Sequence, residues 1–172
     1  MRRALPLLCL LLPACGWRAG LPAPNGADSV GVRAAEREGT VLERGLEPLL
    51  SDALSEAVEQ WVALPIVAPA EADLVVTSRI LEYRRRGGVR SQENELVETG
   101  VFVRVSAELH DRRTGKLVGQ PVVAQQWSSY ALDVPTNEDA ARDRALRFVA
   151  ETLVLELFDD RAPERVAPPE GR

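Results

Sequence analysis

The chain has 172 residues, with 21 Lys and Arg against 26 Asp and Glu, and aromatic residues make up 5% of it. The two cysteines lie at 9 and 15 and the one histidine at 110, which is too few for a Cys/His zinc site. An acidic chain also lacks the basic surface on which general nucleic-acid binding depends, so no nucleic-acid partner is expected.

The first sixteen residues read MRRALPLLCLLLPACG, with two arginines before a short apolar run. The run is too short to cross a bilayer, which takes roughly 20 apolar residues, and its basic start indicates an export signal. Its end, Leu12-Pro13-Ala14-Cys15, resembles the lipobox of bacterial lipoproteins, although proline is unusual at the second position. The resemblance implies that residues 1–14 are removed and that Cys15 carries the lipid; ordinary export is the alternative.

Composition divides the rest of the chain into three parts. Residues 15–28 contain prolines and glycines and are predicted to be the lipidated cysteine and a short tether. Residues 29–160 have the length of one domain. Residues 161–172 hold three prolines and five charged side chains, which predicts a disordered tail. Without the signal peptide, 19 basic and 26 acidic side chains leave a net charge of −7, and Cys15 has no partner for an intramolecular disulfide.

The first half of the domain contains one clear helix. Alternation of apolar residues predicts a strand near 30–34, followed by a charged loop over 36–44. Residues 46–61 carry apolar side chains at the 3-4 spacing of a helix with one buried stripe, and residues 66–67 could form a brief edge strand. The members of that stripe are Leu46, Leu49, Leu50, Ala53, Leu54, Ala57, Val58 and Trp61.

Alternation then predicts three more strands. Residues 73–84 place Ile80 on one face and Arg79 and Tyr83 on the other. Residues 96–130 read as an antiparallel hairpin whose turn, at residues 111–115, ends in a glycine.

A second helix is predicted over about 138–158, with acidic residues in its first turn. Its wide apolar arc, which includes Phe148, implies heavy burial. Together the elements predict an α+β fold: a small, mostly antiparallel or mixed sheet of about four strands with two helices packed on one face.

In this order the motifs resemble the LPS-assembly lipoprotein family of the LptE type, the partner of the LptD outer-membrane barrel. The resemblance rests on Cys15-Gly16-Trp17, on residues 46–54 (LEPLLSDAL), on residues 72–76 (ADLVV), on residues 111–115 (DRRTG) and on the closing helix. It implies a non-enzymatic protein that is lipid-anchored on the periplasmic face of the outer membrane of a Gram-negative bacterium. Such a protein plugs the barrel and supports lipopolysaccharide transport.

Residues 72–76 and 111–115 also resemble periplasmic lipoproteins with a TolB-N-, CsgG- or LpoB-like domain. That alternative implies a protein-binding activator of cell-wall synthesis or secretion. The short tether of this chain favours the first resemblance.

One basic island stands out in the acidic chain. Arginine binds phosphate through two parallel hydrogen bonds and keeps its charge, so the island could bind the phosphates of lipopolysaccharide or the barrel. The alternative is a solvated loop balanced by Glu93, Glu95 and Glu98. The candidate binding residues are Arg79, Arg84, Arg85, Arg86 and Arg90, with Arg104 nearby.

The sequence offers no catalytic motif. It has no glycine-rich phosphate loop and no serine nucleophile elbow, so we expect no enzymatic activity, no metal and no cofactor beyond the lipid on Cys15. His110 is expected to be structural. Trp127 and Tyr130 are either partner-contacting aromatics or part of the sheet packing.

Overall fold

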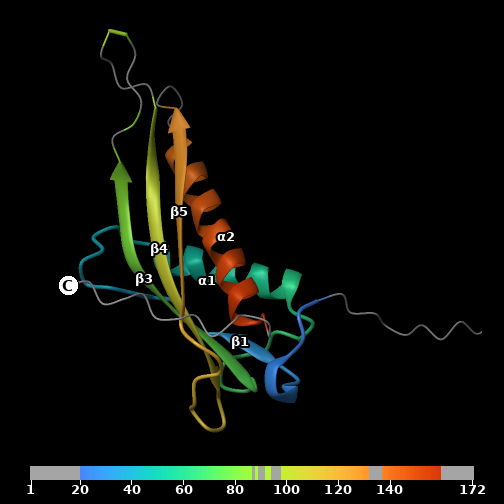
Figure 1. Ribbon diagram of the computed structural model, residues 1–172. Coiled ribbons are helices and arrows are strands. Elements are labelled where there is room, and N and C mark those ends of the chain that lie inside the picture. Colours follow the sequence, from blue (N-terminus) through green and yellow to red (C-terminus); the bar gives the residue numbers. More distant parts are fainter. Residues whose placement is uncertain (1–19, 87, 89–91, 94–97, 132–136, 160–172) are drawn as a thin grey trace, which may run out of the picture.

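The computed structural model describes residues 20–86, 88, 92–93, 98–131 and 137–159. The predicted signal peptide, Cys15, Arg90 and the predicted tail lie outside these residues. One five-stranded sheet carries two helices on a single face, which confirms the predicted α+β fold (Figure 1).

Four strands of the sheet lie in the order β1-β3-β4-β5, and β2 pairs with β3 beside β1. The strands β1 and β2 run parallel to β3, whereas β3, β4 and β5 are antiparallel, so the sheet is mixed. The elements are η1 (Pro24–Gly26), β1 (Val30–Val32), β2 (Glu36–Arg37), α1 (Leu46–Trp61), β3 (Leu74–Arg86), β4 (Glu98–Asp111), β5 (Val122–Ala131) and α2 (Asn137–Leu157).

The core lies between the sheet and the two helices. Ile80, Val103 and Val105 of the sheet are fully buried, as are Leu54 of α1 and Leu153 of α2. Burying a side chain of this size contributes about 1.5–3 kcal/mol. The apolar stripes that predicted both helices therefore also hold them against the sheet.

A β-bulge corrects the predicted faces of β3. Ile80 pairs with Val105, but Glu82 pairs with Arg104, so Leu81 is an extra residue in its strand. One inserted residue moves every later side chain to the opposite face. Tyr83 therefore faces the helices with Ile80, not the side of Arg79.

Two aromatic side chains are more exposed than their helical positions predict. Trp61, at the last residue of α1, is 37% exposed, and Phe148 of α2 is 50% exposed. Arg144, one turn before Phe148, donates a hydrogen bond to the carbonyl of Ser129 on β5 (3.1 Å). The stripe of α2 that carries Phe148 thus faces the outer edge of the sheet, where no further element covers it among the described residues.

Three short segments also differ from the predicted pattern. Glu36–Arg37, predicted as loop, forms β2, and Ile66 makes an isolated bridge to Val30 where a brief edge strand was expected. Leu21, predicted as tether, pairs with Val62, and its N–H donates to the carbonyl of Trp61 (2.7 Å). The chain thus contacts the domain from Leu21 onward.

Within the described part of the chain, no helix combines the length and apolar character needed to span a membrane.

Candidate partner-binding face of the sheet

The face of the sheet opposite α1 and α2 carries the candidate site, and no helix of the described residues covers it. A cross-strand row of three side chains crosses this helix-free face, since Arg84 pairs with Phe102 and Phe102 pairs with Trp127. The guanidinium of Arg84 lies 4.9 Å from the centre of the Phe102 ring, which is cation–π distance. Trp127 remains 36% exposed. The row therefore offers a partner both a positive charge and apolar area.

Gly100 makes room for the ring of Trp127. A Cβ atom on Gly100 would lie within 2.7 Å of the carbonyl oxygen of Ser128 and would collide with the Trp127 ring. Glycine at this position thus lets the indole lie directly over the backbone of β4, which fixes its orientation on the helix-free face.

A polar groove of about 250 Å³ extends the same face toward β1 and β2. Arg79 donates to Glu36 across one side of the groove (2.8 Å), and His110 lies 2.9 Å from Glu108 across the other. The Arg79–Glu36 ion pair and the carboxylate of Glu108 give the groove both signs of charge. The lining residues are Arg33, Ala34, Glu36, Thr77, Ser78, Arg79, Ser106, Ala107, Glu108 and His110.

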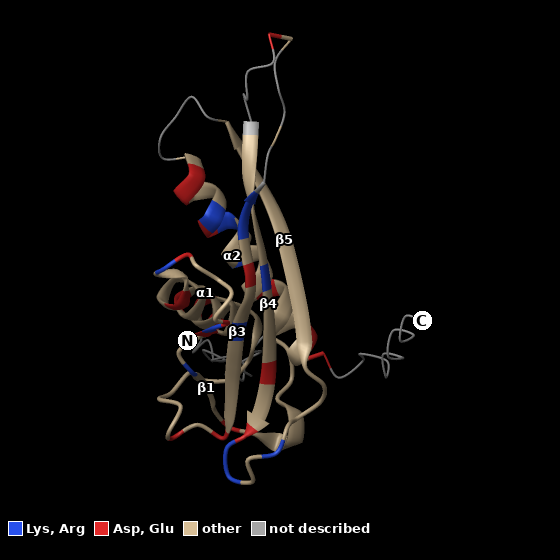
Figure 2. Ribbon diagram, turned by 90° about the vertical axis from the view of Figure 1, so that its left-hand side faces the viewer, with Lys and Arg blue, Asp and Glu red and all other residues tan. Residues whose placement is uncertain are grey.

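The predicted arginine island is divided between the two faces of the sheet. Arg79 and Arg84 lie on the helix-free face, where Glu36 and Glu82 pair with them. Arg85 lies on the helix face. Arg86 ends β3, and Arg90 lies outside the described residues. Figure 2 shows basic and acidic segments alternating along β3 and β4 instead of one basic block. Binding of lipopolysaccharide by these arginines stays a prediction.

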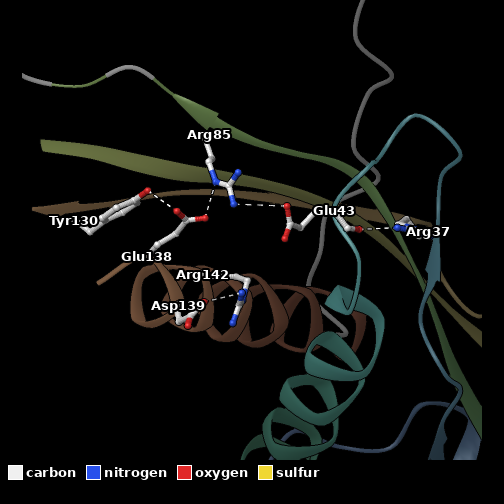
Figure 3. Close-up of polar contacts among 7 residues, drawn as sticks. All are labelled: Arg37, Glu43, Arg85, Tyr130, Glu138, Asp139 and Arg142. Atoms are coloured by element: carbon white, nitrogen blue, oxygen red, sulfur yellow. Dashed lines mark hydrogen bonds and ion pairs between the residues drawn. The ribbon is translucent and has the colours of Figure 1, made fainter. Parts of the chain in front are cut away.

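On the helix face, Arg85 belongs to a polar network at the end of the sheet (Figure 3). Its Nε lies 2.6 Å from Oε1 of Glu138, and its Nη2 lies 3.8 Å from Oε2 of Glu43. The hydroxyl of Tyr130 donates to the other oxygen of Glu138 (2.9 Å). Tyr130 therefore has a structural partner, whereas Trp127 on the opposite face is exposed.

The network shifts three pKa values. Partial burial alone would raise the pKa of Glu138, but hydrogen bonds from Arg85 and Tyr130 outweigh it, so this pKa lies below its ordinary value. Burial, with the charges of Glu138 and Glu43, raises the pKa of Tyr83 to about 12. Burial and the hydrogen bond to Glu138 also raise the pKa of Tyr130.

The hairpin tip has the predicted turn. Gly115 adopts a φ of +68°, and its N–H donates to the carbonyl of Asp111 (2.8 Å). The carboxylate of Asp111 accepts the N–H of Thr114 (2.8 Å), and this hydrogen bond lowers the pKa of Asp111. The turn thus accounts for Asp111 through hydrogen bonds within the turn.

The described residues include no group of three or more His, Cys, Asp or Glu side chains that could hold a metal ion. The helix-free face combines exposed aromatic area, paired charges and a shallow groove.

The sequence matches no protein-family model and no curated protein. Solved structures match it in fold. Protein CT253 of Chlamydia trachomatis has a TM-score of 0.55 at 12% identity, over 75% of this chain and 94% of that chain. A predicted lipoprotein of Caulobacter crescentus has a TM-score of 0.51 at 20% identity, over 74% and 86%. The PelC dodecamer of Paraburkholderia phytofirmans has a TM-score of 0.50 at 16% identity, over 78% and 94%.

The chain shares the fold of these proteins. A predicted bacterial lipoprotein is among them, so the fold is compatible with the lipid anchor that the lipobox predicts at Cys15. At these identities the likeness concerns the fold alone.

Proposed function

We propose that the chain is a lipoprotein of the outer membrane, anchored through Cys15 on the periplasmic side. Its domain binds an LptD-type barrel and supports the transport of lipopolysaccharide. The lipobox, the ordered LptE-type motifs and the fold that the chain has in common with a predicted lipoprotein support this proposal. The structural observation that carries it is the helix-free face, because a sheet covered by helices on one side only leaves a broad second face for a protein partner.

The row of Arg84, Phe102 and Trp127 has the chemistry that lipopolysaccharide requires. The guanidinium can bind phosphate, and the two rings can contact acyl chains. Glu82 already pairs with Arg84 at 2.9 Å, so a phosphate would compete with that carboxylate. The exposed ion pair contributes little stability, so little free energy is lost when a phosphate replaces Glu82 as the partner of Arg84.

Affinity purification of the full chain from outer membranes, followed by mass spectrometry, tests this function. An LptD-type barrel in the purified complex and an acyl mass on Cys15 would support it. A complex without any such barrel would reject it.

A matched pair of variants tests lipopolysaccharide binding separately. Arg84→Ser removes a guanidinium from the helix-free face, whereas Arg85→Ser removes its neighbour on the helix face. We expect Arg84→Ser to weaken capture of lipopolysaccharide severalfold and Arg85→Ser to leave it close to that of the natural chain. Equal binding by both folded variants and the natural chain would exclude the row as the binding site.

A second candidate is a domain that works as an assembly of several copies, because PelC, with the same fold, was solved as a dodecamer. In this case the partner could be a cell-wall synthase or a secretion apparatus. A penicillin-binding protein in the purified complex, instead of a barrel, would favour this candidate.

A further inference from the structure

Among the described residues, hydrogen bonds close the outer edge of β5 only over its second half, from Trp127 to Ala131. Three of its carbonyls point away from β4 and accept hydrogen bonds from side chains: Trp127 from Gln126 (2.8 Å), Ser129 from Arg144 (3.1 Å) and Ala131 from Asn137 (2.8 Å). Successive peptide groups of a strand point in opposite directions. The N–H and C=O groups of Val123 and Gln125 therefore also point outward.

The open part of this edge has two defined ends. At the upper end, Arg144 of α2 occupies the carbonyl of Ser129. At the lower end, Pro121 has no N–H to donate. Between them lies a stretch of five residues, from Val123 to Trp127. A free edge of this kind is a template for another strand.

We propose that a second copy of this chain binds here, with the two β5 strands antiparallel and a two-fold axis at Gln125. The register puts Gln125 opposite the partner's Gln125 and Val123 opposite the partner's Trp127. The carbonyl of Trp127 has a second lone pair, so it can accept the partner's Val123 N–H while it keeps the bond from Gln126. The two sheets become one continuous sheet with all four helices on the same face.

In this register the lower end of the open stretch in one copy lies opposite the upper end in the other, and their hydrogen-bonding groups are compatible. Pro121 lies opposite the partner's Ser129. An antiparallel pair would call for an N–H from residue 121 to the partner's Ser129 carbonyl, and proline cannot supply it. Arg144 already supplies that hydrogen bond within each copy. The missing donor therefore leaves no acceptor unsatisfied.

The exposed apolar side chains also match across the axis. Of the seven large apolar side chains exposed in the described residues, four lie on β5 or α2: Val123 at 46%, Trp127 at 36%, Phe148 at 50% and Leu155 at 37%. Val123 opposite the partner's Trp127 is a β-branched–aromatic cross-strand pair, a favourable combination in antiparallel sheets.

On the helix face of the sheet, Phe148 of one copy and Leu155 of the other are placed to contact each other across the two-fold axis. Arg144 marks the level of Ser129 along the edge, and four strand residues, about 13 Å, separate Ser129 from Gln125. That length equals about nine helix residues counted from Arg144, so α2 reaches the level of the axis near Leu153. Phe148 and Leu155 lie on either side of this point. The two-fold axis therefore brings Phe148 to the partner's Leu155.

The spacing of the two α2 helices is suitable for packing. In each copy, α2 lies over β4 and β5 on the same face of the sheet (Figure 1). Strands lie about 4.8 Å apart, so a continuous sheet puts the two helix axes roughly 10 Å apart, at the upper end of the usual helix-packing range. The inference uses the edge of β5 and does not depend on the proposed function.

Disulfide cross-linking of the full chain in membranes tests the register. Cα atoms of a hydrogen-bonded antiparallel pair lie about 5.5 Å apart, within disulfide range. Gln125→Cys should give a disulfide-linked dimer on mild oxidation. The matched control Ser129→Cys has an exposed position on the same strand and face, but faces the partner's Pro121. We expect at least tenfold more dimer from Gln125→Cys, and none from the natural chain. Equal yields from both variants, or no dimer from Gln125→Cys, would overturn the proposal.

A second measurement needs no new cysteine. Phe148→Asp puts a charge in the helix contact of the dimer while the residue is half exposed within one copy. Sedimentation in detergent should show a dimer for the natural chain and a monomer for Phe148→Asp with an unchanged circular dichroism spectrum. A natural chain that sediments as a monomer at all concentrations would contradict the proposal.

Discussion

The Nε of Arg85 lies 2.6 Å from Oε1 of Glu138, and this ion pair joins β3 to the first turn of α2 (Figure 3). Tyr130 of β5 holds the other oxygen of the same carboxylate at 2.9 Å. One glutamate of α2 therefore contacts both strands that flank β4.

Removal of the Arg85–Glu138 ion pair should lower the free energy of unfolding only slightly. The side chain of Arg85 is 58% exposed and that of Glu138 is 28% exposed, so water screens the pair. We expect a coupling of about 0.5–1 kcal/mol between Arg85→Ala and Glu138→Gln in a double-mutant cycle of urea denaturation. A coupling near zero would show that the pair does not hold α2 to β3.

Acid should weaken the same contact. The folded pKa of Glu138 lies below its ordinary value of 4.5, so its contribution to stability is present above pH 4.5 and is lost as the pH falls through the folded pKa. The free energy of unfolding should thus decline below about pH 4.5, and less steeply in Glu138→Gln. Parallel curves for the two proteins would contradict this assignment.

The two tyrosines of the chain should resist alkaline ionisation. Burial raises the pKa of Tyr83 to about 12, and that of Tyr130 is also raised above 10. The ultraviolet absorbance of tyrosinate should show less than half of the tyrosine ionised at pH 10 in the folded chain and about half in urea. Because the folded values are raised, this contribution to stability is present below pH 10 and is lost as the pH rises through them. Half ionisation of the folded chain at pH 10 would disprove the burial of Tyr83.

Gly100→Ala should displace Trp127. The new methyl group would collide with the indole ring and the carbonyl of Ser128, so we expect a loss of about 1–3 kcal/mol in the free energy of unfolding and a change in tryptophan fluorescence. Gly39→Ala is the control, because nothing lies within 4 Å of its added Cβ and it should be neutral or slightly stabilising. Similar effects of the two substitutions would show that Trp127 does not lie over Gly100.

Regular elements with strong periodicity could be predicted from the sequence. The 3-4 spacing over residues 46–61 matches α1 residue for residue, and the hairpin of β4 and β5 follows from alternation and a turn ending in Gly115. These signals are local, because the spacing of apolar side chains within one segment is enough to predict its secondary structure.

The remaining features depend on distant contacts. Leu81 continues the alternation of β3 as an ordinary strand residue would, so nothing in the pattern reveals a bulge, and the predicted face of Tyr83 is reversed as a result. The partner of Arg85 lies 53 residues away. Phe148 fits the apolar arc of its helix, but only the end of the sheet at β5 determines that it is uncovered.

Recovery of an outer-membrane barrel by two charge-reversal variants tests the central claim most directly. Arg104→Glu reverses a charge in the middle of the helix-free face, and Arg147→Glu makes the same change at an exposed position on α2. With both variants folded and lipidated, affinity purification should lose the LptD-type barrel for Arg104→Glu and retain it for Arg147→Glu. Retention by Arg104→Glu with loss by Arg147→Glu, or equal recovery by both, would contradict the assignment of the partner to this face.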